Sequence, residues 1–240
     1  MSAESHAILY SFRRCPFAMR ARLAIDIAQQ RCELREVVLA AKPAALLAAS
    51  PKGTVPVWVD PRAGVIDQSL DIMRHVLTQG GCVNYLPSSD PDHVTHDWVQ
   101  TCDGAFKHHL DHYKYASRYA EPASTSLHHR ACAAAFIETL DAPLQTSGHL
   151  AGDVQGWPDL AIAPFIRQFR LADAQWFDQQ PWPGVHAWLG RFLADPRFVR
   201  IMQKFPPWCE GEAGIAFPLE DIATASQPSP GQTCLAGGHD

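Results

Sequence analysis

The chain has 240 residues, 47% of them hydrophobic and 19% charged, with a formal net charge of −5, which predicts a globular protein of one large or two ordinary domains. The negative charge argues against nucleic acid and an anionic membrane as main partners. No apolar run reaches the roughly 20 residues of a membrane span, and Glu4 and His6 interrupt the place where a signal peptide requires an apolar stretch.

Residues 1–80 alternate strand and helix patterns, which predicts a mixed α/β domain in the order β-α-β-α-β-β-α. Short apolar runs favour strands, while helical spacing of apolar residues or an opening proline favours helices. The predicted strands are Ala7–Ser11, Leu34–Leu39, Val55–Val59 and Val65–Ile66, and the predicted helices are Pro16–Gln30, Pro43–Ala49 and Ser69–Thr78.

The second part of the chain carries no strand pattern. A glycine break followed by a polar, proline-containing stretch predicts a linker over 81–90, and an all-helical domain is expected over 91–209. Residues 210–240 are rich in Gly, Pro, Ser and Thr, so an irregular tail is expected there. The predicted helices are Pro91–Tyr119, Ser124–Leu144, Trp157–Phe177 and Pro183–Lys204, the last of them broken near Pro196.

The seven cysteines are widely spaced and include no Cys-x-x-Cys pair, which disfavours a disulfide framework or structural zinc and favours the reducing cytoplasm. Cys15 differs from the others because Pro16 suits the first helical position, which makes Cys15 the helix N-cap. Free amides and the helix dipole there favour a negative sulfur, and residues 13–22 carry four arginines and no acid. The pattern predicts a lowered thiol pKa and a reactive nucleophile; the alternative is a buried cysteine that happens to precede a proline.

A second unusual feature is Pro56, which stands inside an apparent central strand, where an ordinary proline fits poorly. A cis peptide bond between Val55 and Pro56 would explain its presence. The alternative is an edge strand with a trans proline.

Four segments of the chain, in the right order and spacing, resemble the cysteine-type glutathione transferases, that is, the omega class and its bacterial relatives. They correspond to the active-site stretch, the cis-proline segment, the start of the third helix and the start of the buried sixth helix. The resemblance implies a thioredoxin-like N-terminal domain followed by an all-α C-terminal domain, the glutathione transferase fold. The segments are Leu9–Arg22, Pro51–Val57, Asp67–Ile72 and Pro158–Phe165.

The resemblance also implies a role for each matching residue. Cys15 would form a mixed disulfide with glutathione, and Ser69, with the amides of its helix terminus, would hold the γ-glutamyl carboxylate. Gln68 would accept from the γ-glutamyl amine, and Lys42 would face the glycine carboxylate. The implied glutathione-binding residues are Phe17, Lys42, Val55, Pro56, Gln68 and Ser69.

Two positions depart from the family. Gln68 stands where the family usually has Glu, so a charged hydrogen bond becomes a neutral one, about half as strong, unless Asp67 or Asp71 supplies the charge. Gly156 replaces the Ser or Thr that caps the sixth helix, and Asp159 is expected to return its side chain to the cap amide.

With cysteine at the catalytic position, the sulfur is expected to act as the nucleophile in reversible thiol–disulfide exchange. Ala18 stands where a dithiol glutaredoxin has its second cysteine, so a second glutathione must resolve the mixed disulfide. The expected activity is deglutathionylation, dehydroascorbate-type reduction or other reductive chemistry on a small electrophilic or disulfide substrate. The helical domain is expected to form the second-substrate pocket, although aromatics at this spacing are more often core. The candidate wall residues are Phe106, Leu110, Tyr113 and Tyr115.

Other functions stay open. One is a conjugating transferase in which Cys15 or Ser11 only stabilises the glutathione thiolate. Another is a non-catalytic binding protein of the same fold, but such proteins usually lose the active thiol or the carboxylate-binding serine, and Cys15 and Ser69 are both present. A third is a monothiol glutaredoxin, against which the long helical part argues. A homodimer is expected from the resemblance alone.

Histidines are concentrated in the second part of the chain. Among His108, His109 and His112, two imidazoles are spaced i, i+4, a geometry able to share a metal, and the adjacent His128 and His129 add two more. No carboxylate or cysteine completes a convincing ligand set. A solvated helix face is therefore favoured and no metal is expected.

Overall fold

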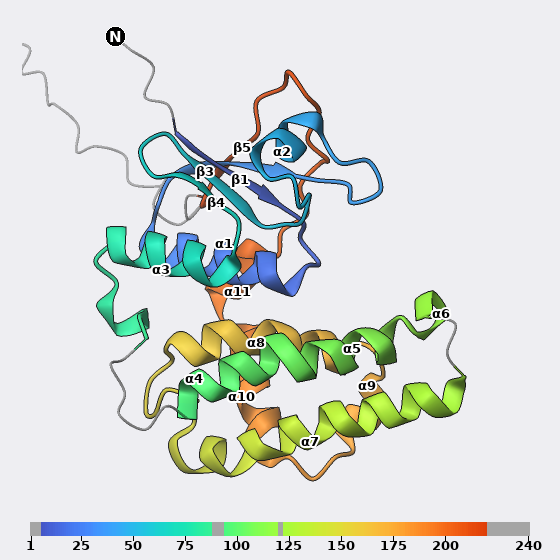
Figure 1. Ribbon diagram of the computed structural model, residues 1–240. Coiled ribbons are helices and arrows are strands. Elements are labelled where there is room, and N and C mark those ends of the chain that lie inside the picture. Colours follow the sequence, from blue (N-terminus) through green and yellow to red (C-terminus); the bar gives the residue numbers. More distant parts are fainter. Residues whose placement is uncertain (1–5, 88–93, 120–121, 220–240) are drawn as a thin grey trace, which may run out of the picture.

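The computed structural model describes residues 6–87, 94–119 and 122–219 (Figure 1). A sheet with its helices lies above a helical bundle, and α1, α8 and α11 lie at the junction between them. The strands are β1 (Ala7–Ser11), β2 (Cys32–Glu36), β3 (Val57–Asp60), β4 (Gly64–Ile66) and β5 (Ile215–Phe217). The helices are α1 (Pro16–Ala28), α2 (Ala44–Ala49), α3 (Ser69–Gln79), the short 3₁₀ helix η1 (Val83–Tyr85), α4 (Val94–Thr101), the π-helical turn η2 (Cys102–Phe106), α5 (Lys107–Lys114), α6 (Ala116–Tyr119), α7 (Ala123–Ser147), α8 (Trp157–Arg170), α9 (Ala174–Asp178), α10 (Pro183–Ala194) and α11 (Pro196–Ile201).

The N-terminal domain is thioredoxin-like, as the sequence predicts. Its strands lie in the order β4-β3-β1-β2-β5, with β1 parallel to β2 and antiparallel to β3. Helices α1 and α3 cover one face of the sheet and α2 the other (Figure 1). The apolar run of β1 is buried, with Leu9 and Ser11 both fully inaccessible, because helices cover both faces.

The expectation of an irregular tail from residue 210 is wrong for residues 215–217. Residues 215–217 form β5, which pairs antiparallel with β2 and places Phe217 opposite Cys32. Just before β5, the backbone amide of Trp208 donates to the carbonyl of Glu36 at 2.7 Å, and its ring lies under the Arg35 guanidinium at 4.2 Å. A three-residue edge strand is too short to show alternation in the sequence. Residues 220–240 lie outside the described part of the chain.

The C-terminal domain is helical, and its predicted helices are more divided than expected. The predicted helix over 91–119 consists of α4, the π-helical turn η2, α5 and α6, and its first three residues lie outside the described ranges. The predicted helix Trp157–Phe177 is divided into α8 and α9, while the last helix is interrupted before Pro196 as predicted. Among the described residues, no helix combines the length and apolar character needed to cross a membrane.

Two buried arginines of α1 join the domains. Arg20 donates from Nε to the carbonyl of Ala161 in α8 at 2.5 Å and forms a bidentate ion pair with Asp103 in η2, at 2.9 and 2.5 Å. Its guanidinium also lies 4.3 Å from the centre of the Phe165 ring. The bidentate geometry and the stacked ring are the arrangement that arginine, rather than lysine, can make. Arg20 therefore holds the start of α1 against the helical domain.

Arg22, two residues further along α1 and therefore on the opposite side of the helix, has an equivalent role there. Its Nε donates to the hydroxyl of Ser11 at 2.7 Å, its Nη1 donates to the carbonyl of Ile201 at 3.1 Å, and it forms an ion pair with Glu36. These contacts connect β1, β2 and α11. Both arginines are thus neutralised by acids from other elements.

Candidate active site

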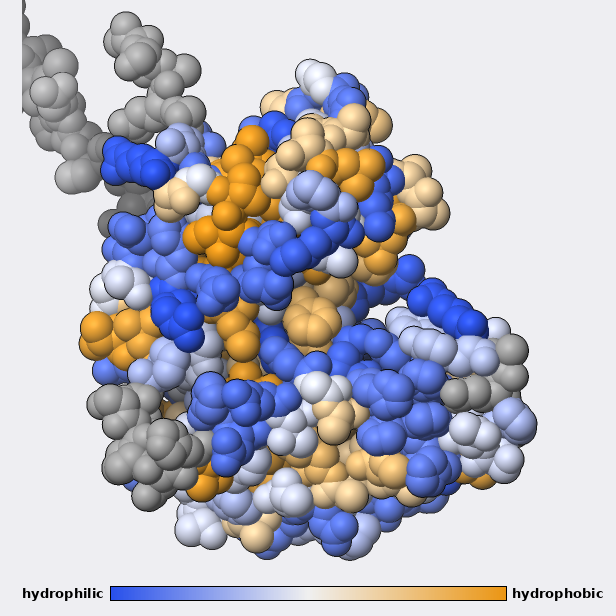
Figure 2. Space-filling model, in the orientation of Figure 1, coloured by the Kyte–Doolittle hydropathy of each residue, from blue (hydrophilic) through white to orange (hydrophobic). Residues whose placement is uncertain are grey.

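Cys15 is the N-cap residue of α1, with Pro16 as the first helical residue, as the sequence predicts. The loop between β1 and α1 places its half-buried side chain beside the segment before β3. The Cys15 Sγ lies 3.6 Å from the carbonyl oxygen of Val55. Figure 2 shows a hollow between the two domains on the side where α1 begins.

The pKa of the Cys15 thiol is raised, so the predicted lowering is wrong. Burial of the sulfur is the largest effect, because it penalises the charged thiolate. The backbone amides of Ala18 and Phe17, followed by the positive charges of Lys107 and Arg20, lower the pKa by less. The sequence showed the helix terminus and the arginines but not the burial, nor that Arg20 is paired with an acid.

Lys107, the first residue of α5, is a part of this site that the sequence did not indicate. Its charge acts on the Cys15 thiol, and its Nζ lies 5.7 Å from the centre of the Phe17 ring. In the sequence Lys107 precedes Asp111 by four residues, which is typical of an exposed helical ion pair, and that pair does form. Its closeness to Cys15 depends on the packing of the two domains.

The rate of alkylation of Cys15 should therefore increase with the thiolate fraction up to alkaline pH. We expect the rate with iodoacetamide, measured by peptide mass spectrometry, to keep rising above pH ~8.5, the ordinary pKa of a cysteine, since burial raises the pKa of this thiol. Lys107→Gln should shift the curve to still higher pH, because a cation that stabilises the thiolate is removed. Lys204→Gln, at an exposed position, is the matched control. A plateau below pH 8 would contradict the raised pKa.

The peptide bond between Val55 and Pro56 is cis, as predicted from the proline inside the strand pattern. Strand β3 begins only at Val57, so Pro56 stands just before the ladder. Both residues of the cis pair are buried. The Val55 carbonyl is the backbone group that faces the Cys15 sulfur.

The sheet register brings three loops to one edge. Tyr10, near the end of β1, is opposite Val57 at the start of β3, and Trp58 is opposite Ile66 at the end of β4. The segments that follow β1, precede β3 and follow β4 therefore leave the sheet at the same edge. Two loops of this edge carry Cys15 and the cis proline, and the third leads into Ser69.

Ser69 and Gln68 lie at the start of α3. Ser69 is its first residue and is buried, with an exposed fraction of 6%. Gln68 is the N-cap residue, makes no side-chain capping bond and is exposed. A helix of eleven residues presents free amides and a positive dipole end here, which favour an anionic group.

The two acids that could replace the family's Glu each have a cationic neighbour of their own. Asp67 accepts from the Ser50 hydroxyl and from Lys52 Nζ, both at 2.9 Å, and these bonds lower its pKa. Asp71 forms an exposed ion pair with Arg74 at 3.1 Å. Asp67 is the nearer in sequence to Gln68, and it is ionised at neutral pH.

Two further residues of the implied site lie at its borders. Phe17 is half-buried and meets the Phe165 ring edge to face, with centroids 4.8 Å apart. Lys42 is exposed in the loop before α2 and lies over Gly53. Gly53 has a φ of +59°, and a Cβ there would come within 2.9 Å of the Leu47 side chain, so this turn requires glycine.

Two of the four candidate wall residues are core residues instead. Phe106 and Leu110 have exposed fractions of 1% and 0%, and the Phe106 ring packs on Phe136 with centroids 5.2 Å apart. Their apolar spacing reflects the face of the helix that packs inward. Tyr113 and Tyr115 are half-buried and stay candidates.

The alternative that Ser11 stabilises a glutathione thiolate does not fit the structure. Ser11 is fully buried, and its hydroxyl accepts from Arg22 Nε at 2.7 Å. Tyr10 is also buried, and its hydroxyl accepts from Arg35 at 2.8 Å. Of Tyr10, Ser11 and Cys15, only Cys15 is half-buried rather than buried.

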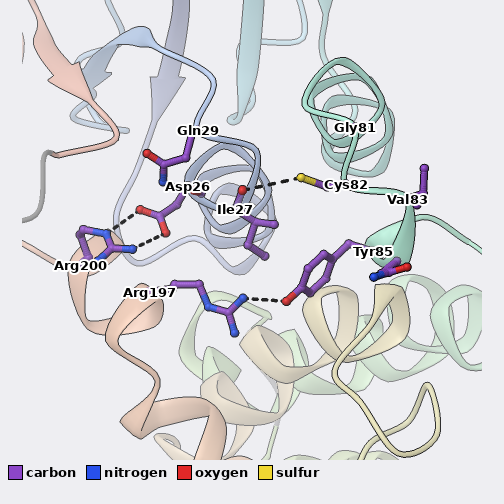
Figure 3. A pocket seen from close by; sticks show the side chains of 10 residues that line it. Asp26, Ile27, Gln29, Gly81, Cys82, Val83, Tyr85, Arg197 and Arg200 are labelled. Atoms are coloured by element: carbon purple, nitrogen blue, oxygen red, sulfur yellow. Dashed lines mark hydrogen bonds and ion pairs between the residues drawn. The ribbon is translucent and has the colours of Figure 1, made fainter.

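A separate cavity of about 340 Å³ lies at the other end of α1 (Figure 3). Arg200 donates to the carboxylate of Asp26 at 2.8 and 2.9 Å, and Arg197 donates to the Tyr85 hydroxyl at 2.8 Å. Since α1 has 13 residues, this cavity lies about 20 Å from its N-terminus. It is not part of the Cys15 site.

Comparison with known proteins identifies the family. Residues 9–81 match the glutathione S-transferase N-terminal domain, and residues 97–191 match the glutathione S-transferase C-terminal domain. The chain belongs to the glutathione S-transferase family. A search of curated proteins gave no match. The match to the N-terminal domain includes Cys15, the cis proline Pro56 and Ser69.

Solved glutathione transferases share this fold. A family member from Pseudomonas fluorescens with two glutathione bound is 20% identical, with a TM-score of 0.71, and the match covers 84% of this chain and 95% of that one. One from Burkholderia graminis, with two glutathione molecules per subunit, is 18% identical, with a TM-score of 0.71 and coverages of 84% and 89%. One from Phanerochaete chrysosporium, in complex with oxidised glutathione, is 14% identical, with a TM-score of 0.72 and coverages of 84% and 96%.

Proposed function

We propose that this glutathione S-transferase binds glutathione in its N-terminal domain and uses Cys15 as the nucleophile of a glutathione-dependent thiol–disulfide reductase. The observation that carries the proposal is the Cys15 sulfur at the start of α1, 3.6 Å from the carbonyl before the cis proline. A tripeptide lying along this edge of the sheet could pair with the backbone of Val55 while its own sulfur meets Cys15. The glutathione found in the three neighbouring structures supports this choice of ligand.

The remaining glutathione contacts are carried over from the family resemblance, residue by residue. Ser69 and the amides at the start of α3 would bind the γ-glutamyl carboxylate, and Gln68 would accept from the γ-glutamyl amine. Lys42, exposed above the turn at Gly53, would face the glycine carboxylate. Phe17 would close the site against the helical domain. Asp67 precedes Gln68 but is paired with Lys52, so the contact with the amine is assigned to Gln68.

The proposed reaction has two exchanges. The Cys15 thiolate attacks the glutathione sulfur of a mixed disulfide, the substrate S–S bond breaks, and the substrate leaves as a thiolate that takes up a proton. A second glutathione thiolate then attacks the glutathione sulfur bound to Cys15, which releases oxidised glutathione and the Cys15 thiolate. Ala18, at the place of a second cysteine, is fully buried and carries no thiol, so resolution is assigned to glutathione.

The raised pKa of Cys15 gives this reaction a pH dependence. Only the thiolate attacks, and its fraction at neutral pH is small, whereas a thiolate of higher pKa is intrinsically more nucleophilic. The exchange rate should therefore rise with pH through the neutral range.

We assign binding of the second substrate to the hollow bordered by α1 and α5. Tyr113 and Tyr115 are its remaining candidate wall residues.

The domain roles follow from this site. We assign glutathione binding to residues 1–80, a linker to 81–90 and second-substrate binding to the helices of 91–209. Residues 210–219 join the N-terminal sheet through β5 and are therefore grouped with the first domain. A cytoplasmic homodimer stays a prediction from the sequence.

The proposal is tested by locating the mixed disulfide. The full chain is incubated with oxidised glutathione at pH 8, quenched with acid and mapped by peptide mass spectrometry without reductant. We expect a glutathione adduct on Cys15 in excess of adducts on Cys132 and Cys209, which are half-buried and exposed free thiols. Added reduced glutathione should remove the Cys15 adduct. Equal labelling of the three thiols would count against a glutathione site at Cys15.

A further inference from the structure

The helical domain carries a cluster of histidines that the Cys15 site described above does not include. Helices α5 and α7 lie side by side (Figure 1), and each contributes imidazoles to the space between them. The cluster comprises His108, His109, His112, His128 and His129. His129 is buried, with an exposed fraction of 8%, so the expectation of a solvated helix face is wrong for this residue.

The closest contacts join the two helices. His109 Nδ1 lies 2.8 Å from His129 Nδ1, so that one ring donates and the other accepts. The ring centroids of His108 and His129 are 5.6 Å apart. Three ring nitrogens, one from each of His108, His109 and His129, lie within 4.8 Å of one another. The i, i+4 spacing of His108 and His112 places their ring centroids 4.3 Å apart. The three residues whose nitrogens converge, however, come from two helices, α5 and α7.

We propose that His108, His109 and His129 form a binding site for one divalent transition-metal ion, with Zn²⁺ as the ion that best fits. Imidazole nitrogen is a ligand that Zn²⁺, Cu²⁺ and Ni²⁺ accept, whereas Mg²⁺ and Ca²⁺ require oxygen ligands. Three imidazoles leave a fourth position for water, which the exposed His108 side of the cluster can supply.

The geometry requires little change on binding. Two nitrogens bound to one tetrahedral Zn²⁺ at about 2.0–2.1 Å lie about 3.3 Å apart. The His109–His129 pair, at 2.8 Å, would open by about half an ångström, and the His108 nitrogen would move inward from within 4.8 Å. Rotations of the imidazole rings provide shifts of this size without movement of the helices. Bound metal would connect α5, which carries Lys107 of the Cys15 site, to α7.

The site is tested by metal binding to the full chain prepared without a histidine tag. Titration with Zn²⁺ against a chromophoric chelator should give one tight site, and Co²⁺ should give a tetrahedral absorption spectrum without a thiolate-to-metal charge-transfer band. His109→Gln and His108→Gln should each weaken Zn²⁺ binding at least about tenfold. Two control variants should leave the Zn²⁺ affinity unchanged. They are His96→Gln, at an exposed position of α4 outside the cluster, and Cys132→Ser.

Folding of the variants is checked by circular dichroism and by the unfolding midpoint in EDTA. Because His108 is exposed, His108→Gln remains informative if a variant at a more buried position fails to fold. Wild-type affinity in a folded His108→Gln and His109→Gln double variant would overturn the proposal, as would a thiolate band in the Co²⁺ spectrum. The proposal would be supported if Zn²⁺ raises the unfolding temperature of the wild type but not that of the double variant. The test does not depend on glutathione.

Discussion

Replacement of Cys15 by serine is expected to lower the rate of glutathione-dependent hydroxyethyl disulfide reduction at least about 100-fold, because the nucleophile is removed. A serine hydroxyl cannot form the mixed disulfide. It can still cap α1, since serine is a favoured N-cap residue, so the fold and the unfolding midpoint should be retained. The measurement is the initial rate in the coupled glutathione reductase assay for wild type and variant at pH 8.

The controls separate reduction from conjugation. Cys209→Ser changes an exposed free thiol and should retain the wild-type rate. In a parallel assay with 1-chloro-2,4-dinitrobenzene, Cys15→Ser should conjugate glutathione at least as fast as wild type, because a hydroxyl can stabilise the glutathione thiolate without being consumed. An unchanged disulfide reduction rate in Cys15→Ser would contradict the proposed nucleophile.

Replacement of Asp159 by alanine is expected to reduce the free energy of unfolding by about 3–5 kcal/mol. Asp159 is fully buried at the start of α8, and its carboxylate accepts from four donors. They are the amides of Leu150 at 2.8 Å, Ala151 at 3.2 Å and Gly156 at 2.9 Å, and Trp188 Nε1 at 2.8 Å. Alanine leaves these donors without an acceptor, and each buried unsatisfied group is costly.

Urea unfolding at fixed pH measures the effect. Asp159→Asn, which keeps the shape and one acceptor oxygen, should lie between the alanine variant and wild type. Asp153→Ala, an exposed acid in the loop just before α8, should change the free energy of unfolding by no more than about 0.5 kcal/mol. A fall of less than 1 kcal/mol in Asp159→Ala would show that the loop is not held by this carboxylate.

Locally determined features were predictable from the sequence. The bounds of β1 and the start of α1 match the structure, because a short apolar run and a proline at the first helical position act through neighbouring residues. The cis bond at Pro56 is one of the two explanations that the sequence offered for a proline in a strand pattern, although the strand itself begins two residues later than predicted, at Val57. The return of Asp159 to the Gly156 amide was also predicted, since a capping box spans only three residues.

Features that depend on distant residues were not predictable. Arg20 binds Asp103, 83 positions away, so one of the arginines expected to lower the pKa of Cys15 is paired with an acid, and its effect on the thiol is smaller than that of burial. The sign of the Cys15 pKa shift depends on burial by the whole fold. The packing of Phe106 into the core follows from contacts with helices that the sequence does not place. Strand β5 is recognised only by its partner, β2.

That pairing has a consequence for how the polypeptide is made. The sheet that starts with β1 at residues 7–11 is completed only when residues 215–217 have been synthesised. Until then β2 presents an open edge with unpaired backbone groups, the kind of edge that promotes association with other chains. A fragment ending before residue 210 would keep that edge permanently. Of the two domains, the α/β domain begins before the helical one and is completed after it.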